Sequence, residues 1–308
     1  MSALLRRGDR VAVVAPGFAV HKEALDSGLA ALARRGIRAA EGDHLREIDG
    51  YFAGDDAARE ADLRAAIDDR ELDAIWFARG GYGTARLLER IDLGPLVRRP
   101  KLLLGYSDVT ALSGALLART RALCLQAPFV AELGRKEAFH APSLAAMLAG
   151  RPVRRRLAAR DILFPGKARG RLMGGNLTVL THLVGTPYMP DLRGSILFFE
   201  EAGEQAYRID RLLNHLRMAG ALRGLAAVAV GQLSVPATTR AFPGDRDVEE
   251  VLRDHLLPLG VPVVQGIPVG HGDGKWTIPI GGEAALDTAR GVMTFTPKPV
   301  AGPRPRRA

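Results

Sequence analysis

Short apolar runs alternate with helix-like segments through the first 120 residues, and this alternation restricts the fold more than any other feature of the chain. The runs typical of buried strands are 9–15, 37–40, 74–77 and 101–104. Segments with helical spacing of apolar residues separate or follow them, at 21–35, 55–68, 84–91 and 108–120. Strands alternating with helices at this spacing predict a parallel sheet with crossover helices.

The second half of the chain has a different texture, with strand-like runs gathered late in the sequence. Two segments have helical spacing, 176–184 and 208–218, and the strand-like runs are 195–199, 226–230, 261–264, 276–280 and 292–295. An arginine-rich stretch and the breaker pair Pro165-Gly166 separate the halves. We therefore expect four regions: an N-terminal domain over 1–150, a linker over 151–169, an α+β domain over 170–298 and a disordered basic tail over 299–308.

The net charge of +9 comes from two short segments. Residues 151–160 hold five arginines and no acid, and residues 298–308 hold four basic residues and no acid. These nine account for the whole excess of basic over acidic residues. A nucleic-acid-binding protein more often carries its charge on a folded face. We therefore expect no nucleic-acid binding; the alternative predicts salt-sensitive affinity that is lost when both segments are deleted.

Cysteine usage and hydropathy favour a cytoplasmic protein. The single cysteine, Cys124, excludes an internal disulfide framework and a cysteine-rich metal site. The best apolar run near the start, 11–20, is interrupted by Pro16-Gly17 and is far shorter than the roughly 18 residues of a membrane span. Charged residues between 6 and 10 interrupt the apolar segment that a secretory signal peptide requires. We expect no membrane association.

A serine lies at the sharpest strand-to-helix transition of the predicted sheet. The strand ends at Gly105-Tyr106, and a helix is expected directly after Ser107. A serine in such a turn exposes its hydroxyl beside a helix N-terminus, which stabilises negative charge, as in a nucleophile elbow. The G-x-S-x-G pattern is not met, because Val109 replaces the second glycine. The alternative role for Ser107 is a helix N-cap, with Asp108 in the first turn.

A glycine-rich loop, RGGYG at 79–83, follows the preceding strand. Glycines allow backbone N–H groups to approach a ligand closely. The loop fits neither G-x-G-x-x-G nor a phosphate-loop pattern. Because this loop and Ser107 both follow strands of one parallel sheet, the N–H groups of Gly81 and Asp108 are candidate donors to an oxyanion. The alternatives are a purely structural turn and a non-catalytic site for an anionic ligand.

Two more candidates lie in the second half. Glu200 follows the apolar run 195–199, and alternation along a strand directs its side chain away from that of Glu201. His271 lies in the glycine-rich loop VGHGDG, which gives it the best access among the seven histidines. Together with Ser107 these residues supply the types of a nucleophile, base and acid triad, but spacing alone does not show that they meet. Neither H-E-x-x-H nor C-x-x-C occurs, so a zinc hydrolase is not expected.

Five stretches together resemble the LD-carboxypeptidases, the serine peptidase family of muramoyltetrapeptide carboxypeptidases and microcin C immunity peptidases. They occur in family order between residues 11 and 281: VAVVAPG, FARGGYGTARLLERID, KLLLGYSDVTAL, MGGNLTVLTHLVGTPYMPDLRGSILFFEEAGEQAYRIDRLLNHL and GIPVGHGDGKWTIPIG. The resemblance implies a Rossmann-like N-terminal domain with a parallel sheet and a smaller, swivelling β/β/α C-terminal domain. Carried over by motif, the triad is Ser107, Glu200 and His271. The oxyanion hole maps onto the N–H groups of Gly81 and Asp108.

The resemblance also implies a substrate and an assembly. The expected activity is release of the terminal D-alanine from murein tetrapeptide in peptidoglycan recycling, by a cytoplasmic homodimer without metal or cofactor. The alternative within the family is an immunity-type peptidase acting on a peptidyl- or aminoacyl-nucleotide antibiotic such as microcin C. Trp276 is a candidate to stack on the nucleobase of such a substrate, although its strand position favours core packing.

Two residues in matching motifs, Asn176 and Arg208, are implied as substrate contacts, with structural roles as the alternative. The chain departs from the family at Gly17-Phe18-Ala19, where Ser-Gly is frequent. We therefore expect this loop to give the pocket a different rim.

Overall fold

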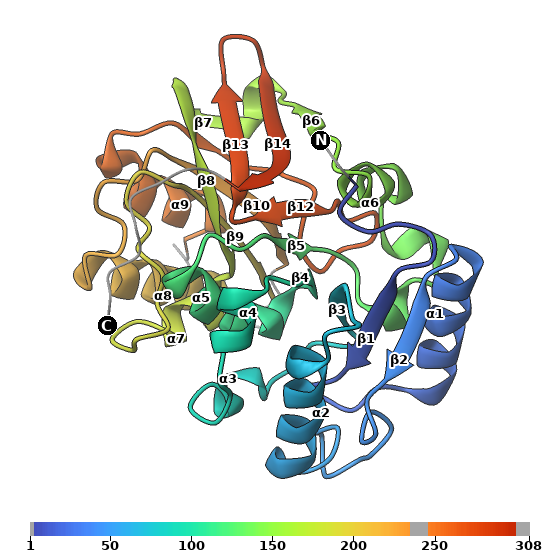
Figure 1. The fold of residues 1–308 in the computed structure, drawn as a ribbon. Helices are drawn as coiled ribbons and strands as arrows, with labels where there is room; N and C mark the ends of the chain where they lie inside the picture. Colours follow the sequence, from blue (N-terminus) through green and yellow to red (C-terminus); the bar gives the residue numbers. More distant parts are fainter. Residues whose placement is uncertain (1–2, 235–245, 300–308) are drawn as a thin grey trace.

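The computed structural model describes residues 3–234 and 246–299, which form two sheets lying against each other with helices around them (Figure 1). This mixed α/β architecture confirms the predicted fold class. The basic tail predicted over 299–308 lies outside the described residues from 300 onward.

The first sheet is built mainly by the N-terminal half. In the described part of the chain it has six strands in the order β12-β5-β4-β3-β1-β2. Their bounds are β1 (Arg10–Val14), β2 (Arg38–Glu41), β3 (Ala74–Phe77), β4 (Leu102–Gly105), β5 (Cys124–Gln126) and β12 (Ile278–Ile280). Strands β1 to β5 are parallel, as the alternation predicts, and β12 pairs antiparallel with β5.

The helices of this half are α1 (Lys22–Arg34), α2 (Asp56–Asp68), α3 (Thr84–Leu87), α4 (Gly94–Arg98) and α5 (Thr110–Arg119). Helix α2 contacts α3 and α4, and α5 contacts the same two helices. The strand order reverses between β1 and β3, and open α/β sheets bind ligands at such a reversal, beyond the carboxyl ends of the strands. The loops after β1, β3 and β4 are therefore where the fold favours a site.

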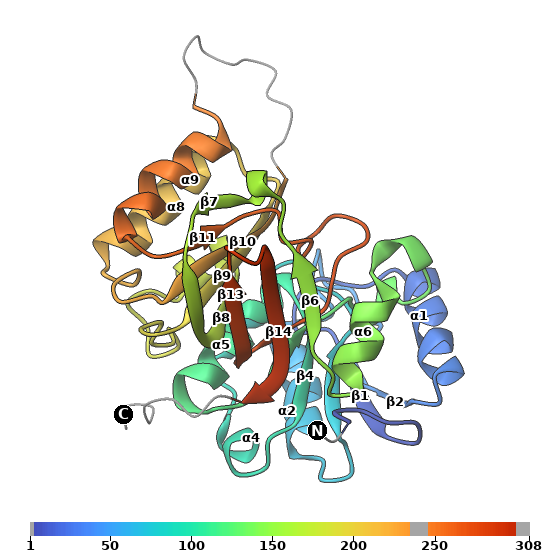
Figure 2. The same cartoon turned by 90° about the horizontal axis from the view of Figure 1, so that it is seen from above.

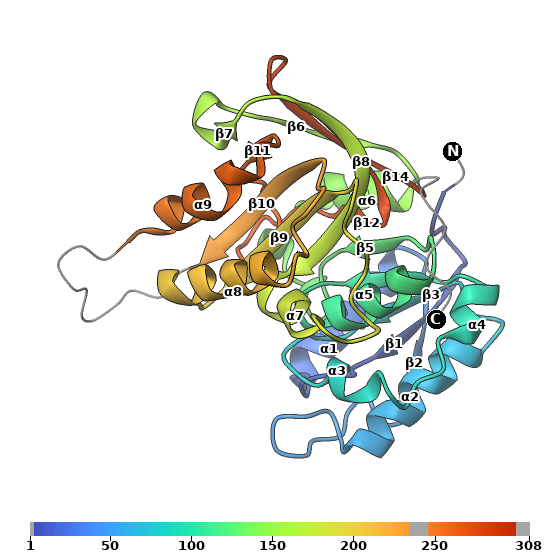
Figure 3. The same cartoon turned by 90° about the vertical axis from the view of Figure 1, so that its left-hand side faces the viewer.

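The second sheet has eight strands among the described residues, in the order β6-β14-β13-β8-β9-β10-β11-β7. They are β6 (Val153–Arg156), β7 (Ile162–Phe164), β8 (Lys167–Asn176), β9 (Ile196–Ala202), β10 (Ala227–Ser234), β11 (Val263–Val264), β13 (Gly282–Asp287) and β14 (Val292–Pro299). Strands β8 to β11 are parallel in this order. The accompanying helices are α6 (Ala141–Leu148), α7 (Leu177–His182), α8 (Ala206–Met218) and α9 (Val248–Leu256), and α8 and α9 lie side by side (Figures 2 and 3).

Two segments differ from the predicted domain plan. Residues 151–169, predicted as a linker, instead hold β6, β7 and the start of β8. Strand β6 lies at the edge of the sheet, where it pairs with β14. It has one buried residue, Val153, followed by three arginines, so its sequence lacks the apolar run or alternation that predicts a strand. The run 276–280, predicted in the second domain, crosses to the first sheet as β12. This crossing joins the segment after His271 to the half that carries Ser107.

Candidate active site

Ser107 occupies a strained turn between β4 and α5. Its φ of 56° makes it the one non-glycine residue with positive φ among the described residues. A short 3-10 helix, η1 (Ser107–Val109), starts at this residue, and its N-cap is Tyr106 without a side-chain cap hydrogen bond. Ser107 therefore does not act as the N-cap. Strained backbone of this kind is concentrated at functional sites, where the surrounding structure holds it in place.

The Ser107 hydroxyl is the first member of a hydrogen-bonded chain that spans both sheets. Its Oγ lies 3.0 Å from Nε2 of His271, and Nδ1 of His271 lies 2.7 Å from Oε2 of Glu200. Glu200 is fully buried on β9, whereas His271, in the loop between β11 and β12, has a side chain 30% exposed. With Nδ1–H donating to the carboxylate, Nε2 is free to accept the serine proton.

Burial and charge act against each other on the acid and the base. Burial raises the pKa of the Glu200 carboxyl, and the hydrogen bond with His271 opposes that rise. Burial also lowers the pKa of His271, but the hydrogen bond and the charge of Glu200 outweigh it, so the pKa lies above its ordinary value. The pair therefore favours a protonated imidazole, which is the state a general base reaches when it has removed a proton.

Two glycine-containing turns, after β1 and β3, lie beside the turn of Ser107. A Cβ added to Gly80 would lie 3.2 Å from Cβ of Ser107, and one added to Gly17 would lie 2.9 Å from the carbonyl oxygen of Gly80. Gly81 is exposed, with a φ of 101° that side chains other than glycine rarely adopt. The glycines after β1 and β3 thus allow the backbone to approach the serine closely, as an oxyanion hole requires.

The side chain of Asp108 ties the glycine loop to the serine turn. It is buried, and its Oδ2 accepts hydrogen bonds from N of Thr84 at 2.8 Å and from Oγ1 of Thr84 at 2.7 Å. Burial raises the pKa of Asp108, and the bonds from Thr84 oppose the rise. Among the backbone hydrogen bonds outside helices and strands in the described parts of the chain, none is donated by N–H of Asp108 or Gly81. The assignment of these two groups as oxyanion donors stays a prediction.

The loop that carries His271 is fixed from β10. Oε1 of Gln232 accepts a hydrogen bond from N of Gly272 at 2.9 Å. A Cβ on Gly270, whose φ is 151°, would lie 2.8 Å from Cβ of Gln232 and 3.1 Å from Oε2 of Glu200. Gln232 and Thr84 are not predicted as site residues from the sequence, because neither has a local signal that distinguishes it from an ordinary polar residue.

Both halves of the chain match models of a known protein family. Residues 11–127 match the model of the LD-carboxypeptidase N-terminal domain, and residues 169–286 match that of the LD-carboxypeptidase C-terminal domain. The chain belongs to the LD-carboxypeptidase family. The resemblance inferred from the five sequence stretches is thereby confirmed.

Named relatives in the family match over nearly the whole chain. A Bacillus subtilis protein named "Probable murein peptide carboxypeptidase" is 34% identical, covering 92% of this chain and 91% of its own. The murein tetrapeptide carboxypeptidase of Pseudomonas aeruginosa is 31% identical, covering 91% and 94%. The crystal structure of the muramoyltetrapeptide carboxypeptidase from Oxalobacter formigenes superposes with a TM-score of 0.85 at 30% identity, over 94% and 100% of the chains. Carboxypeptidases of murein peptides are thus among this chain's relatives.

The two predicted substrate-binding residues of this family member have different surroundings. Asn176 is buried, where its Oδ1 caps α7 through N of Val179 and its Nδ2 donates to Glu201 at 3.0 Å. Arg208 is exposed on α8 and bonds to Glu204 and Tyr207. These contacts give Asn176 a structural role beside the acid, and substrate binding by either residue stays a prediction.

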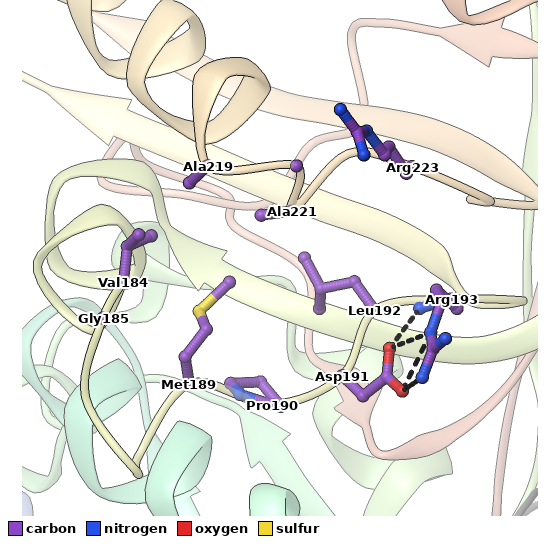
Figure 4. A pocket seen from close by; sticks show the side chains of 11 residues that line it. Val184, Gly185, Met189, Pro190, Asp191, Leu192, Arg193, Ala219, Ala221 and Arg223 are labelled. Carbon is purple, nitrogen blue, oxygen red and sulfur yellow. Dashed lines mark hydrogen bonds and ion pairs between the residues drawn. The ribbon is translucent and has the colours of Figure 1, made fainter.

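Other features of this family member lie away from the triad. A cavity of about 490 Å³ opens between the loops that precede β9 and β10, with Met189, Leu192, Arg193 and Arg223 in its wall (Figure 4). It lies near the start of β9, whereas Glu200 lies toward that strand's carboxyl end. Within the described residues, no cluster of three or more histidine, cysteine or acidic side chains is arranged to hold a metal ion. No helix in that part of the chain is long and apolar enough to cross a membrane.

Proposed function

We propose that this chain is a serine-type LD-carboxypeptidase that cleaves the L–D amide bond of a murein tetrapeptide and releases the terminal D-alanine. The observation that carries the proposal is the continuous chain from Ser107 Oγ through His271 to Glu200, at 3.0 and 2.7 Å. The names of the relatives support a murein peptide as substrate.

The proposed mechanism is acyl transfer. His271, oriented by Glu200, takes the Ser107 proton as Oγ attacks the scissile carbonyl. The N–H groups of Gly81 and Asp108 stabilise the oxyanion, each donor worth about 3–4 kcal/mol in comparable hydrolases. The tetrahedral intermediate collapses as His271 gives its proton to the amine of the leaving D-alanine. Water, deprotonated by His271, then attacks the acyl-enzyme and frees the tripeptide and the serine.

The C-terminal carboxylate of the substrate needs a cationic partner, and a guanidinium fits it best. We propose Arg208 for this role, with Asn176 as a further substrate contact, on the basis of the family motifs in which they lie. An Arg208→Gln variant should then raise KM for the tetrapeptide more than it lowers kcat, because the contact exists before the reaction starts. An unchanged KM would contradict the assignment.

The first experiment compares wild type with Ser107→Ala on L-Ala-D-Glu-meso-diaminopimelate-D-Ala, following D-alanine release by mass spectrometry. Ser113→Ala is the matched control, since Ser113 is a buried serine of α5 that bonds only to the carbonyl of Thr110 within the described residues. Release by wild type and the control, but not by Ser107→Ala, supports the proposal. Equal release by all three would contradict serine catalysis. No release would redirect the search to peptidyl-nucleotide conjugates, the alternative substrates.

We also propose that the enzyme is a cytoplasmic homodimer that needs no metal or cofactor. This rests on the family resemblance and on a mechanism that the triad completes by itself. Light scattering coupled to gel filtration should give twice the mass of one chain, and EDTA should leave activity unchanged. A monomer, or an EDTA-sensitive enzyme, would contradict the respective part.

A further inference from the structure

An ion pair between a buried lysine and a partly exposed glutamate joins the loop of His271 to the half of the molecule that carries Ser107. Lys275, four residues after His271, is 4% exposed, and its Nζ lies 2.5 Å from Oε1 of Glu132. Glu132 ends a 3-10 helix, η2 (Val130–Glu132), that follows β5 of the first sheet. The pair therefore bridges two segments 143 residues apart in sequence.

The same carboxylate also contacts the residue next to the expected nucleophile. Oε1 of Glu132 accepts a hydrogen bond from the Tyr106 hydroxyl at 3.0 Å, and its Oε2 accepts one from N of Phe129 at 2.8 Å. The ring of Tyr106 stacks on Phe129 with centroids 4.4 Å apart, and it meets the His271 ring edge-on at 5.0 Å. The side chain of Glu132 thus binds both Tyr106, which precedes Ser107, and Lys275, which lies four residues after His271.

We propose that Glu132 and Lys275 are positioning residues that set His271 against Ser107 across the two sheets. This rests on the proposed function, in which Ser107 is the nucleophile and His271 the base. The backbone already anchors the loop, since the carbonyl oxygen of Lys275 accepts a hydrogen bond from N of His140 at 2.8 Å. The side-chain pair adds the link to Tyr106. Burying the Lys275 ammonium costs desolvation, and we attribute its presence to the geometry that the pair fixes.

The charge of Lys275 also acts on the pKa of His271. The groups that face His271 are Glu200 and Glu201 from β9, Lys275 from its own loop, and Tyr106 and Ser107 from the turn after β4. Both glutamates raise the pKa of His271, and the ammonium of Lys275 lowers it. Lys275→Met should therefore raise this pKa. Glu132→Gln leaves the ammonium without its counter-charge and should lower it. These shifts test whether both charges act on the base, and the labelling rates described below test whether the pair positions it.

The test uses the full chain and two readouts that need no natural substrate. One is the second-order rate constant for labelling of Ser107 by a fluorophosphonate, which forms an O–P bond with Oγ and releases fluoride. The other is the pKa of His271 from its imidazole NMR signals. The variants are Glu132→Gln, Lys275→Met, Lys275→Arg and Tyr106→Phe. Lys167→Met is the matched control, because it breaks a surface pair with Asp287 on the second sheet.

We expect Lys275→Met and Glu132→Gln to label on the order of 10- to 100-fold more slowly, since small displacements of a base cost that much. Lys275→Arg should restore most of the rate, Tyr106→Phe should lose less, and Lys167→Met should match wild type. Wild-type labelling rates in Glu132→Gln and Lys275→Met, or His271 shifts of the same sign in both, would overturn the inference. If either variant does not fold, Tyr106→Phe and the variant that folds decide it. Failure of wild-type Ser107 to label would instead contradict the proposed function, and the NMR shifts would still test the pair.

Discussion

The carboxylate of Asp108 accepts two hydrogen bonds from Thr84, one from its backbone N–H and one from its hydroxyl. Thr84 begins α3 directly after the glycine loop, and Asp108 directly follows Ser107. This contact therefore sets the distance between the two expected oxyanion donors. Both residues are almost completely buried, so the hydroxyl bond has no competition from solvent.

Thr84→Val should destabilise the protein by about 1.5–3 kcal/mol, because it takes a hydrogen bond from a buried carboxylate. It should also lower kcat, since the glycine loop loses one of its ties to the serine turn. Urea unfolding and D-alanine release measure the two effects. Thr277→Val is the control: Thr277 is fully buried, and its hydroxyl has no partner in the described part of the chain. Equal stability losses in both variants would contradict a special role for the Asp108 contact.

Gly81→Ala should lower kcat by on the order of 10²- to 10³-fold, the usual effect of losing one oxyanion donor. A Cβ at this position would lie 2.2 Å from Cγ of Phe18, in a backbone conformation with a φ of 101°. The loop must therefore move, and its N–H moves with it. Steady-state kinetics with the tetrapeptide measures the loss.

Gly185→Ala is the control for Gly81→Ala, because it introduces the same kind of backbone strain without a steric clash. Gly185 also has a positive φ, 83°, but a Cβ there would meet nothing within 4 Å. It should lose about 1 kcal/mol of stability from the strained φ and keep its kcat. A similar loss of kcat in the two variants would argue against an oxyanion role for Gly81.

The strands and the residue types of the triad were predictable from the sequence, but the contact between the triad residues was not. Apolar runs predicted β1, β3 and β4 closely, because buried parallel strands have short and nearly continuous apolar sequences. The strand β6 was missed, since it consists of one valine and three arginines, two of them exposed at a sheet edge. Ser107 and His271 are 164 positions apart, and they meet where the chain after His271 returns to the first sheet as β12. No local pattern encodes that return, and the triad assignment therefore depended on the family motifs.

No local sequence pattern predicts the positive φ of Ser107. This φ leads to a prediction about the free energy of unfolding. Ser107→Gly should be about 1–2 kcal/mol more stable than Ser107→Ala, because only glycine adopts a φ of 56° without steric cost. Both variants lack the hydroxyl, so losing the bond to His271 affects them equally. Urea unfolding of the two inactive variants measures the difference. An alanine variant as stable as the glycine variant would mean that the turn relaxes when the hydroxyl is absent.

The pH dependence of the reaction should follow the protonation of His271. Only the neutral imidazole accepts the serine proton, so kcat/KM should rise with pH through the pKa of this residue. Glu200 raises that pKa in spite of burial, so the rising limb should lie above the ordinary value of about 6.5. Glu200→Gln removes the charge that raises the pKa and leaves the burial that lowers it. Its limb should move to lower pH.

The plateau of the Glu200→Gln profile should fall by up to about 10⁴-fold, since the imidazole loses the partner that fixes its tautomer and stabilises its charge. Glu283→Gln is the control, because Glu283 pairs with Arg169 on the second sheet and lies outside the hydrogen-bonded chain of the triad. Its profile should coincide with that of wild type. A Glu200→Gln limb at or above the wild-type position would show that another group controls the rising limb, and His271 would then lose its assignment as the base.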